Sequence, residues 1–407
     1  MTAFFHSNIW SIITLLSGNI FWLLILLQVW YLIFFAICGL FYKERSAGIS
    51  ARLHRFVVYI PAYKEDAVII DTTSRALTLD YPKHMFHVVA IADTLRSETL
   101  EALRKMPLQL VEVAFEKSTK AKALNKAIAQ TDEGFDVAIV FDADNVAAPD
   151  YLHRMNDTFN KGYRVVQGQR TAKNKNTPMA LLDAVSEGIN NHIFRKGHRV
   201  VGLSAAIIGS AMGMHFSLFK EVMASLTAVG GFDKEMELNL LSRRITVGYA
   251  SKAIVYDEKV QQAEVLERQR KRWLSAQFVY LRRHLFRGII ALITRGKIDY
   301  FNKVFQMALI PRVILLAILP VFSLLSLLPG QGPSFWHWLI VWISGYLAIA
   351  ISIPRTLWKK KLLRALLTLP IGMLAMFRAL IGMKGANKSF IHTPHGQHDT
   401  NQQKPKQ

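Results

Sequence analysis

The sequence predicts a soluble α/β domain with a mostly parallel sheet, joined to apolar helices at a membrane. Three observations support this fold class. Hydrophobic residues make up 51% of the 407 residues. They are concentrated in residues 1–42 and in the C-terminal quarter of the chain, whereas the region from about Arg55 to Tyr256 alternates short β-rich runs with helical stretches. This distribution is typical of a membrane protein with a large aqueous domain.

The first predicted domain, residues 1–42, contains an uncharged apolar segment at residues 19–41. A segment of this length is enough to cross a hydrocarbon layer of about 30 Å at about 1.5 Å per residue. Basic residues follow it directly at Lys43 and Arg45. Because basic flanks stay on the cytoplasmic side, we expect an integral protein of the plasma (inner) membrane with a cytoplasmic domain. The single cysteine, Cys38, excludes an intrachain disulfide.

The formal net charge of +21 is compatible with a nucleic-acid partner or with a membrane surface. The basic residues are clustered at the edges of apolar segments, at residues 43–55, 282–287 and 355–364. Clusters at such places indicate contact with anionic lipid headgroups. We therefore expect the lipid bilayer as a partner and no nucleic acid.

Residues 43–272 form the predicted cytoplasmic domain. Its clearest strands are apolar runs that each end at a residue able to line one edge of a sheet: residues 56–60 before Pro61, 87–92 before Asp93, and 137–141 before Asp142. A helix is predicted between them at residues 121–130. Alternation of strands and helices predicts a sheet covered on both faces. In such sheets ligands bind beyond the carboxyl ends of the strands.

Three further regions are predicted after this domain. Residues 273–300 are amphipathic and basic, as in helices that lie on a bilayer surface. Residues 301–385 form a transmembrane region with spans near 304–328 and 335–353, followed by a third apolar segment at 362–383 that contains Pro370 and Arg378. The third segment is a kinked span, a re-entrant segment or an interfacial helix. Residues 386–407 are polar and form a predicted flexible tail.

Asp142 and Asp144 lie two residues apart at the end of a predicted strand, so their side chains leave the same face. Two neighbouring carboxylates repel each other unless a positive charge lies beside them. A hard divalent ion that also binds a diphosphate supplies this charge and stabilises a departing leaving group. The alternative is that the aspartates only form a turn.

Three further motifs accompany this pair, and each has a structural alternative. Lys120 opens the predicted helix, where lysine and a helix N-terminus favour anions, although it also suits a solvated helix face. The acidic stretch 233–237 offers carboxylates for proton transfer, or only helix capping. The sequence Gln269-Arg-Lys-Arg-Trp273 combines an amide, cations and an indole suited to phosphate and a sugar ring, or to an interfacial anchor.

Taken in order, these motifs resemble the processive membrane glycosyltransferases of family 2, which include cellulose, hyaluronan, chitin and chitin-oligosaccharide synthases. The resemblance runs from about Val57 to Trp273 and extends to the flanking membrane segments. It implies a GT-A (Rossmann-like) nucleotide-sugar fold, inverting transfer and a Mg²⁺ or Mn²⁺ cofactor. Four of the matching positions belong to the donor side in the family: Tyr63 and Glu65 at the uracil end, Asp93 as the second nucleotide-binding aspartate, and Lys120 near the diphosphate.

The remaining matches concern the metal and the acceptor. Asp142 and Asp144 match the metal motif, with Asp144 as the expected direct ligand. Residues 208–214 are similar to the glycine-rich acceptor-side segment. Gln269, Arg272 and Trp273 match a Q-x-x-R-W motif, in which the resemblance assigns Arg272 to the donor diphosphate and Gln269 and Trp273 to the acceptor sugar.

The catalytic base falls where this chain departs from the family. The family commonly has Thr-Glu-Asp where this chain has Asp233-Lys234-Glu235. Alignment through Glu237 assigns the base to Glu235, with Asp233 as the second candidate. Glutamate is one methylene longer than aspartate but performs the same proton chemistry.

The sequence therefore predicts a hexosyltransferase that moves sugar from a nucleotide-sugar, expected to be a UDP-sugar, to a growing glycan at the membrane. Export of the glycan would need partners, as a homo-oligomer or accessory export proteins. Two alternatives stay open: a single-transfer enzyme with a lipid acceptor, and a catalytically silent membrane scaffold. A transporter is disfavoured because neither many spans nor two similar halves are evident.

Overall fold

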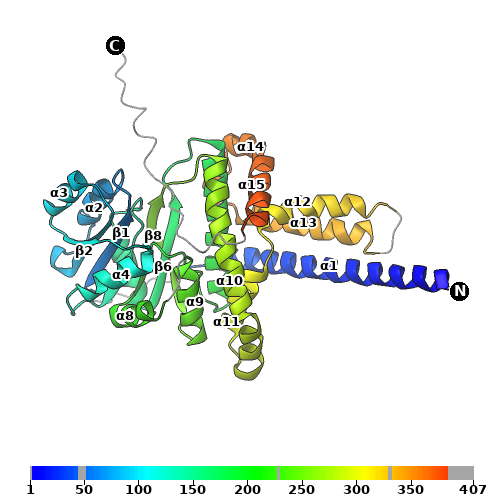
Figure 1. The fold of residues 1–407 in the computed structure, drawn as a ribbon, viewed down its shortest axis with the longest axis horizontal. Helices are drawn as coiled ribbons and strands as arrows, with labels where there is room; N and C mark the ends of the chain where they lie inside the picture. The colour runs from blue at the N-terminus through cyan, green and yellow to red at the C-terminus, as the bar shows by residue number, and fades with distance from the viewer. Residues whose placement is uncertain (1, 45–51, 227–229, 329–331, 384–407) are drawn as a thin grey trace, which may run out of the picture.

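The computed structural model describes residues 2–44, 52–226, 230–328 and 332–383. The predicted tail at residues 386–407 lies outside this part of the chain. An α/β domain occupies one end of an elongated molecule, and an arm of apolar helices projects from the other (Figure 1). A long helix lies between these two parts.

The α/β domain is built on one eight-stranded sheet in the order β3-β2-β1-β4-β7-β6-β8-β5. Strands β3, β2, β1 and β4 are parallel, as are β6 and β8, but β7 is antiparallel to both of its neighbours and β5 is antiparallel to β8. Six of the eight strands therefore run in one direction, in agreement with the predicted mostly parallel sheet, but β7 and β5 run in the opposite direction and make the sheet mixed. The strands are β1 (Phe56–Tyr63), β2 (Phe86–Asp93), β3 (Gln109–Val113), β4 (Val137–Val140), β5 (Val146–Ala147), β6 (Val165–Ala172), β7 (Met212–His215) and β8 (Val247–Asp257).

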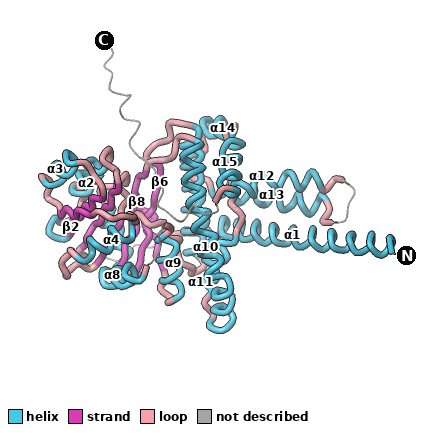
Figure 2. The backbone as a smooth tube through the Cα atoms, in the orientation of Figure 1, coloured by secondary structure: helices cyan, strands magenta, loops and turns pink. Residues whose placement is uncertain are grey.

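Helices cover both faces of this sheet (Figure 2). Ile69 and Leu152, on α2 and α5, belong to the core on one face, and Leu124 and Phe219, on α4 and α8, to the core on the other. The three predicted strands and the predicted helix at 121–130 are confirmed. The helical segments of this domain are α2 (Ile69–Leu77), η1 (Lys83–Met85), α3 (Ser97–Arg104), α4 (Lys120–Ala129), α5 (Tyr151–Phe159), α6 (Pro178–Asn191), the π-helical η2 (His192–Gly197), α7 (His198–Val200), α8 (Phe216–Ser225) and α9 (Phe232–Ser242).

The carboxyl ends of the central parallel strands meet at one edge of the sheet. The register of β1 against β2 aligns Tyr63 with Asp93. Lys64 and Thr94, directly after these strands, have φ angles of 56° and 58°, a left-handed conformation that non-glycine residues rarely adopt. Such strain is often found at functional sites, and here it lies at the edge where α/β sheets bind ligands.

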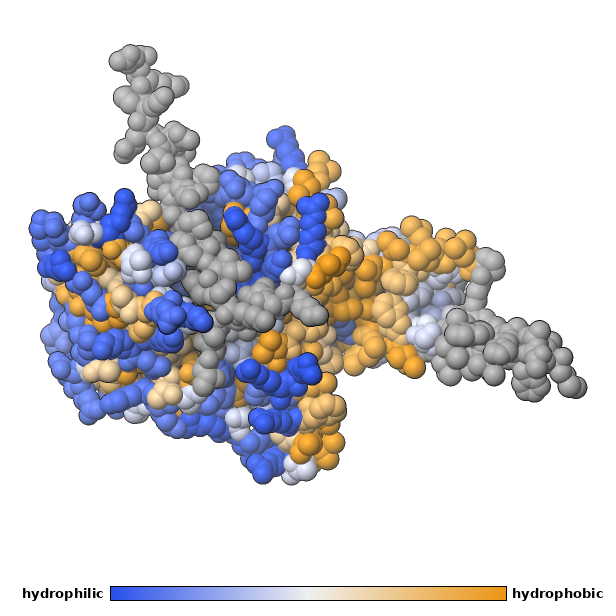
Figure 3. Space-filling view, viewed as in Figure 1, coloured by the Kyte–Doolittle hydropathy of each residue, from blue (hydrophilic) through white to orange (hydrophobic). Residues whose placement is uncertain are grey.

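The apolar arm contains the helices that suit a bilayer. Two described helices are long and apolar enough to cross one, residues Ser17–Leu40 of α1 (Thr2–Leu40) and α13 (Phe335–Ser352), and two bent helix pairs raise the number to four if each pair is one span. Helices α1, α12 (Arg312–Leu325) and α13 run side by side (Figure 1). Much of the surface that they present in Figure 3 is hydrophobic.

The segment predicted as one span at residues 304–328 is not a continuous helix. It is split between α11 (Ile298–Ala308) and α12, which are bent by 62°. Pro311 precedes α12 and lacks an N–H to continue the helix. The side chain of Gln28 on α1 donates to the Ile310 carbonyl at 2.7 Å and accepts from the Ile310 N–H at 3.0 Å. A single amide side chain thus satisfies both the N–H and the C=O of Ile310 at the helix break, as an apolar environment requires.

The predicted interfacial region is dominated by one long helix, α10 (Ala263–Arg295), which begins within the segment assigned to the cytoplasmic domain. It lies across the direction of α1 (Figure 2). Phe286 and Ile293 on α10 are 74% and 77% exposed, as expected for side chains that enter a bilayer surface. The third apolar segment follows the short turn η3 (Arg355–Leu357) as α14 (Lys360–Leu366) and α15 (Leu369–Ile381), bent by 48°.

Candidate active site

A central cavity of about 700 Å³ connects the carboxyl edge of the sheet with the apolar helices. Its lining includes the strand ends, the first turns of α4 and α9, the inner face of α10, and residues of α1 and α11–α15. The sequence-predicted site residues that line it are Tyr63, Glu65, Asp93, Lys120, Asp142, Asp144, Asp233, Gln269, Arg272 and Trp273. These residues come from distant parts of the chain and share one cavity. Glu235 does not line it.

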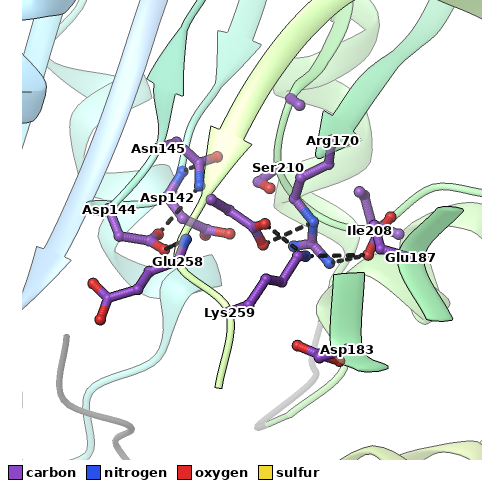
Figure 4. Close-up of polar contacts among 12 residues, drawn as sticks. Asp142, Asp144, Asn145, Arg170, Asp183, Glu187, Ile208, Ser210, Glu258 and Lys259 are labelled. Atoms are coloured by element: carbon purple, nitrogen blue, oxygen red, sulfur yellow. Dashed lines mark hydrogen bonds and ion pairs between the residues drawn. The ribbon is translucent and has the colours of Figure 1, made fainter. Parts of the chain in front are cut away.

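Asp142 and Asp144 follow β4 and are held in different ways. The Asp142 carboxylate forms an ion pair with Lys120 Nζ at 2.5 Å. The Asp144 carboxylate accepts from the Glu258 backbone N–H at 3.0 Å and from Asn145 Nδ2 at 3.1 Å (Figure 4). Asp144 is buried, so these two donors fix its orientation at the cavity wall.

Lys120 keeps Asp142 ionised. Burial raises the pKa of the Asp142 carboxyl, but Lys120 and Arg170 together lower this pKa by more, so that it lies below its usual range. The Lys120 ammonium also donates to the Gly209 carbonyl at 2.7 Å and lies 5.4 Å from the centre of the Phe232 ring. The lysine thus joins the metal motif to the glycine-rich segment and to the start of α9.

The donor set fits a hard divalent cation. No group of three or more His, Cys, Asp or Glu side chains is arranged to share an ion among the described residues. Two carboxylates are nevertheless sufficient for Mg²⁺, which is typically bound through one or two carboxylates, waters and substrate phosphates. Asp142 and Asp144 would hold such an ion at the cavity wall, and the ion would neutralise charge on a leaving diphosphate.

A buried cluster of charged residues adjoins this motif (Figure 4). Glu187 on α6 pairs with Arg170 at 3.0 Å and Arg195 at 3.1 Å, and lies 3.8 Å from Lys259. Asp257 pairs with Lys259 at 2.6 Å and with Arg170 at 3.1 Å. Burial raises the pKa of Glu187, yet the three cations lower it well below its usual range. For Asp257, burial dominates and raises the pKa to about 6.

The strand ends form a second wall of the cavity. Tyr63 ends β1, Glu65 is buried just beyond it, and Asp93 ends β2. The Asp93 carboxylate accepts a hydrogen bond from Thr94 Oγ1 at 3.0 Å. Thr94 stands where the resembling family has a second acid, so a hydroxyl here orients the remaining aspartate.

The two candidates for the catalytic base differ in surroundings. Asp233 lines the cavity near Arg272. Burial lowers the pKa of the Arg272 guanidinium, and the Asp233 carboxylate counteracts part of this decrease. Glu235 instead lies against α10, where it hydrogen-bonds the Tyr280 side chain and raises the Tyr280 pKa further than burial alone. The difference follows from helix geometry, because residues two positions apart on α9 face different directions.

Helix α9 is fixed by its glycine start and by a buried ion pair. Gly231 precedes α9 with φ 71°, and a Cβ there would lie 2.9 Å from the Cβ of Ala276 on α10. Further along, Glu237 is buried with its carboxylate 2.6 Å from Lys303 Nζ on α11. Burial raises the pKa of Glu237 in spite of this partner. The close approach of α9 and α10 holds Asp233 near the Q-x-x-R-W motif.

That motif occupies the first half of α10. Gln269, Arg272 and Trp273 line the cavity. Arg270 between them pairs with Asp183 on α6 at 2.7 Å, and its guanidinium carbon lies 4.5 Å from the centre of the Trp273 ring. This stacking fixes the orientation of the indole.

Comparison with known proteins identifies the family. A family model described as "Glycosyltransferase like family 2" matches residues 54–276. The chain belongs to this glycosyltransferase family. The match covers the sheet, α9 and the Q-x-x-R-W motif at the start of α10. No curated protein sequence matches the chain.

One solved structure supports a GT-A type fold for this family 2 chain. A mannosyltransferase from Pyrobaculum calidifontis, in complex with GDP-mannose and Mn²⁺, is similar with a TM-score of 0.50 and 16% identity over 83% of this chain and 95% of that chain. Glucosyl-3-phosphoglycerate synthase from Mycobacterium tuberculosis is similar with a TM-score of 0.36 and 14% identity over 51% of this chain and 72% of that chain, in complexes with UDP and either Mn²⁺ or Mg²⁺. Only the first comparison bears on the fold.

Sequence reasoning missed several residues that shape the site. Arg170 lies on β6, Glu187 on α6 and Lys259 in the loop after β8, and no local pattern marks them as partners. Gln28 carried one signal, because it is a polar side chain in the middle of the apolar segment 19–41, and polar groups in apolar surroundings need hydrogen-bond partners.

Proposed function

We propose that this family 2 protein is a membrane-associated, inverting glycosyltransferase that uses a nucleotide-sugar donor, a UDP-sugar, with Mg²⁺ or Mn²⁺. The observation that carries the proposal is the single cavity in which the Asp142–Asp144 pair, Lys120 and the Q-x-x-R-W motif meet. Carboxylates for a metal, cations for a diphosphate and an indole for a sugar ring are the groups that this reaction needs.

The donor would lie along the strand ends. Tyr63, Glu65 and Asp93 are assigned to the nucleoside, and Lys120 and Arg272 to the diphosphate. Asp144 and Asp142 are assigned to the metal, which supplies charge stabilisation for the leaving diphosphate. Because Lys120 pairs with Asp142, its ammonium lies beside the metal pair, where it would stabilise the negative charge that develops on the leaving diphosphate.

The acceptor would bind against Gln269 and Trp273. An acceptor oxygen attacks the anomeric carbon, and the new C–O bond forms on the face opposite to the bond that breaks to the diphosphate oxygen. For a hydroxyl acceptor, a carboxylate takes the proton. The position of Asp233 on the cavity wall favours it as this base over Glu235, which the family alignment selects but which contacts Tyr280.

The sequence resemblance favours extension of a growing glycan with possible export, through an oligomer or accessory proteins. A single transfer to a lipid is the alternative, and the membrane-side lining of the central cavity favours it. In both cases α1 and α13 would cross the inner membrane, and the basic residues after α1 would hold the catalytic domain in the cytoplasm. Helix α10 would lie at the interface.

A donor screen with the purified full-length protein tests this proposal. Each common nucleotide-sugar is supplied with Mg²⁺, with Mn²⁺ or with a chelator, and both nucleoside diphosphate release and product mass are measured. We expect metal-dependent release from one donor and its loss in Asp144→Asn. No release from any donor with either metal would contradict the proposal and favour a catalytically silent scaffold.

A further inference from the structure

The membrane-side half of the central cavity differs in chemistry from its donor half. The donor half contains the carboxylates, the lysine and the indole. Aliphatic side chains from α1, α6 and the region α12–α15 line most of the membrane-side half: Leu32, Leu182, Val313, Leu316, Ile349, Ile353, Leu362, Leu366 and Leu369. Phe194 is the one aromatic residue among the lining residues of α6–α7 and α11–α15. A sugar polymer requires hydrogen-bonding groups and aromatic platforms along its path. An aliphatic wall instead suits a hydrocarbon chain.

Helices α11–α15 contribute two cations to the cavity lining, Lys303 and Arg312. Lys303 pairs with Glu237 at 2.6 Å, whereas Arg312 has a different environment. Arg312 is the first residue of α12, and its Nη2 donates to Asn190 Oδ1 at 2.7 Å. Its Nη1 is out of contact with solvent and has no hydrogen-bond partner. The guanidinium carbon lies 5.6 Å from the centre of the Phe194 ring. None of the ion pairs between described residues includes Arg312.

A guanidinium group with an unpaired, buried N–H donor and no ion pair favours the binding of an anion. Burial of a charge without a counter-charge is costly, and the guanidinium fork matches phosphate oxygens in geometry. Arg270 lines the same cavity and lies close enough to Arg312 for the two cations to repel each other. Asp183 compensates Arg270 at 2.7 Å. The Glu187 carboxylate acts favourably on the Arg312 cation at longer range, but it already pairs with two other arginines. The direct partners of Arg312 among described residues are a neutral amide and an aromatic ring.

The position of Arg312 is built into the fold. The chain breaks between α11 and α12, and Gln28 binds both backbone groups of Ile310 at 2.7 and 3.0 Å. This contact fixes the break two residues before Arg312. The helix bend of 62° thus directs the guanidinium to the junction between the polar and the aliphatic halves of the cavity.

We propose that the acceptor is a lipid with a phosphate in its headgroup. The phosphate binds at Arg312, with Arg270 nearby, and the hydrocarbon chain lies along the aliphatic wall towards α12–α15. The headgroup then reaches Trp273 and the donor half. This inference rests on the proposed function, since it names the acceptor class for the same transfer.

The same transfer is chemically possible with two kinds of phosphate-containing lipid. An oxygen of the headgroup forms the bond to the anomeric carbon, and the bond from that carbon to the diphosphate oxygen breaks. When the attacking oxygen belongs to a hydroxyl, as in a phosphoglycerolipid, its proton passes to Asp233. When it belongs to an ionised phosphate, as in an isoprenyl phosphate, no proton has to be removed.

Matched lipid pairs test the inference with the wild-type full-length protein. The protein is purified in a polyoxyethylene detergent, which carries neither phosphate nor sugar, and is supplied with metal and the donor from the screen. The acceptors are isoprenyl phosphate against isoprenyl alcohol, phosphatidylglycerol against diacylglycerol, and a soluble oligosaccharide. We expect a KM at least about tenfold lower for the phosphate member of one pair, and the pair that responds identifies the source.

Two variants separate a specific contact from general basicity. Arg312→Gln removes the cation and should raise the KM for the phosphate lipid about tenfold or more, with a smaller change for the neutral match. Arg75 on α2 is exposed, pairs with Asp71 and does not line the cavity, so Arg75→Gln should change neither KM. If Arg312→Gln does not fold, the wild-type comparison decides alone.

The outcomes separate this inference from the proposed function. Equal KM values within both pairs, or the soluble oligosaccharide as the best acceptor, would overturn the lipid-phosphate inference while metal-dependent release still supports the transferase. Absence of nucleoside diphosphate release with every donor and acceptor would overturn the proposed function itself.

Discussion

The assignment of the catalytic base gives the sharpest test of the geometry. The family alignment selects Glu235, whereas the structure has Asp233 on the wall of the central cavity and Glu235 against Tyr280. Asp233→Asn keeps the size of the side chain and a hydrogen-bonding oxygen but cannot accept a proton at neutral pH. We expect this change to abolish transfer to a hydroxyl acceptor while the protein stays folded.

The expected magnitudes follow from the two environments. General base catalysis contributes about 10²–10⁴-fold, which corresponds to about 3–5 kcal/mol of transition-state stabilisation at 1.36 kcal/mol per tenfold change. Loss of the base should therefore lower kcat for Asp233→Asn by this factor. Glu235→Gln keeps a group that can hydrogen-bond Tyr280, and a single hydrogen bond contributes about 0.5–1.5 kcal/mol to stability. Its kcat should stay within about threefold of wild type.

The assay is steady-state transfer at saturating donor and metal, with kcat and donor KM measured separately. A loss that appears in kcat without an increase in donor KM indicates a step made only in the transition state. Full turnover in Asp233→Asn together with loss in Glu235→Gln would refute the geometric reasoning and restore the alignment-based assignment.

Three further changes test the charged and polar contacts. Lys120→Met removes the main cation that lowers the pKa of Asp142, so the effect of burial should raise this pKa. Mn²⁺ binding to Lys120→Met should therefore become weaker as the pH falls from 7 to 5. Mn²⁺ binding to the wild-type protein should not change over this pH range. Glu187→Gln leaves three buried cations without this carboxylate and should lower the free energy of unfolding by about 3–5 kcal/mol. Gln28→Leu leaves the N–H and C=O of Ile310 unpaired and should cost about 2–6 kcal/mol at about 1–3 kcal/mol for each group.

Each of these changes has a direct readout. Mn²⁺ binding without nucleotide is followed by electron paramagnetic resonance, and a pH-independent Lys120→Met protein would contradict the role given to Lys120. Unfolding in detergent is followed by denaturant titration. Arg75 and Asp71 form an exposed pair one helical turn apart, so Asp71→Asn is the matched surface control, expected to change stability by less than about 1 kcal/mol. An equally small effect for Glu187→Gln would contradict the buried network.

The parts of the fold that sequence patterns predicted are those determined by local chemistry. β1, β2 and β4 are apolar runs that end at polar residues, and α4 has a periodic apolar face. These patterns depend on side-chain alternation within a few residues. The position of the Asp142–Asp144 pair at a strand end followed from the same pattern.

What the sequence did not predict depends on contacts between distant segments. The reversed direction of β7, which makes the sheet mixed, has no local signal. The break before Arg312 is stabilised by Gln28, a residue 282 positions away from Ile310. Asp233 and Glu235 carry the same functional group, a carboxylate. Only the packing of α9 against α10 distinguishes their environments.

The most direct test of the central claim is the position of the metal. Crystals of the full-length protein grown with Mn²⁺ and the nucleoside diphosphate of its donor allow the ion to be located by anomalous scattering. We expect one peak within coordination distance of the Asp144 carboxylate and of the diphosphate oxygens, beside Asp142. A diphosphate bound in the central cavity with the Mn²⁺ peak away from both aspartates would contradict it.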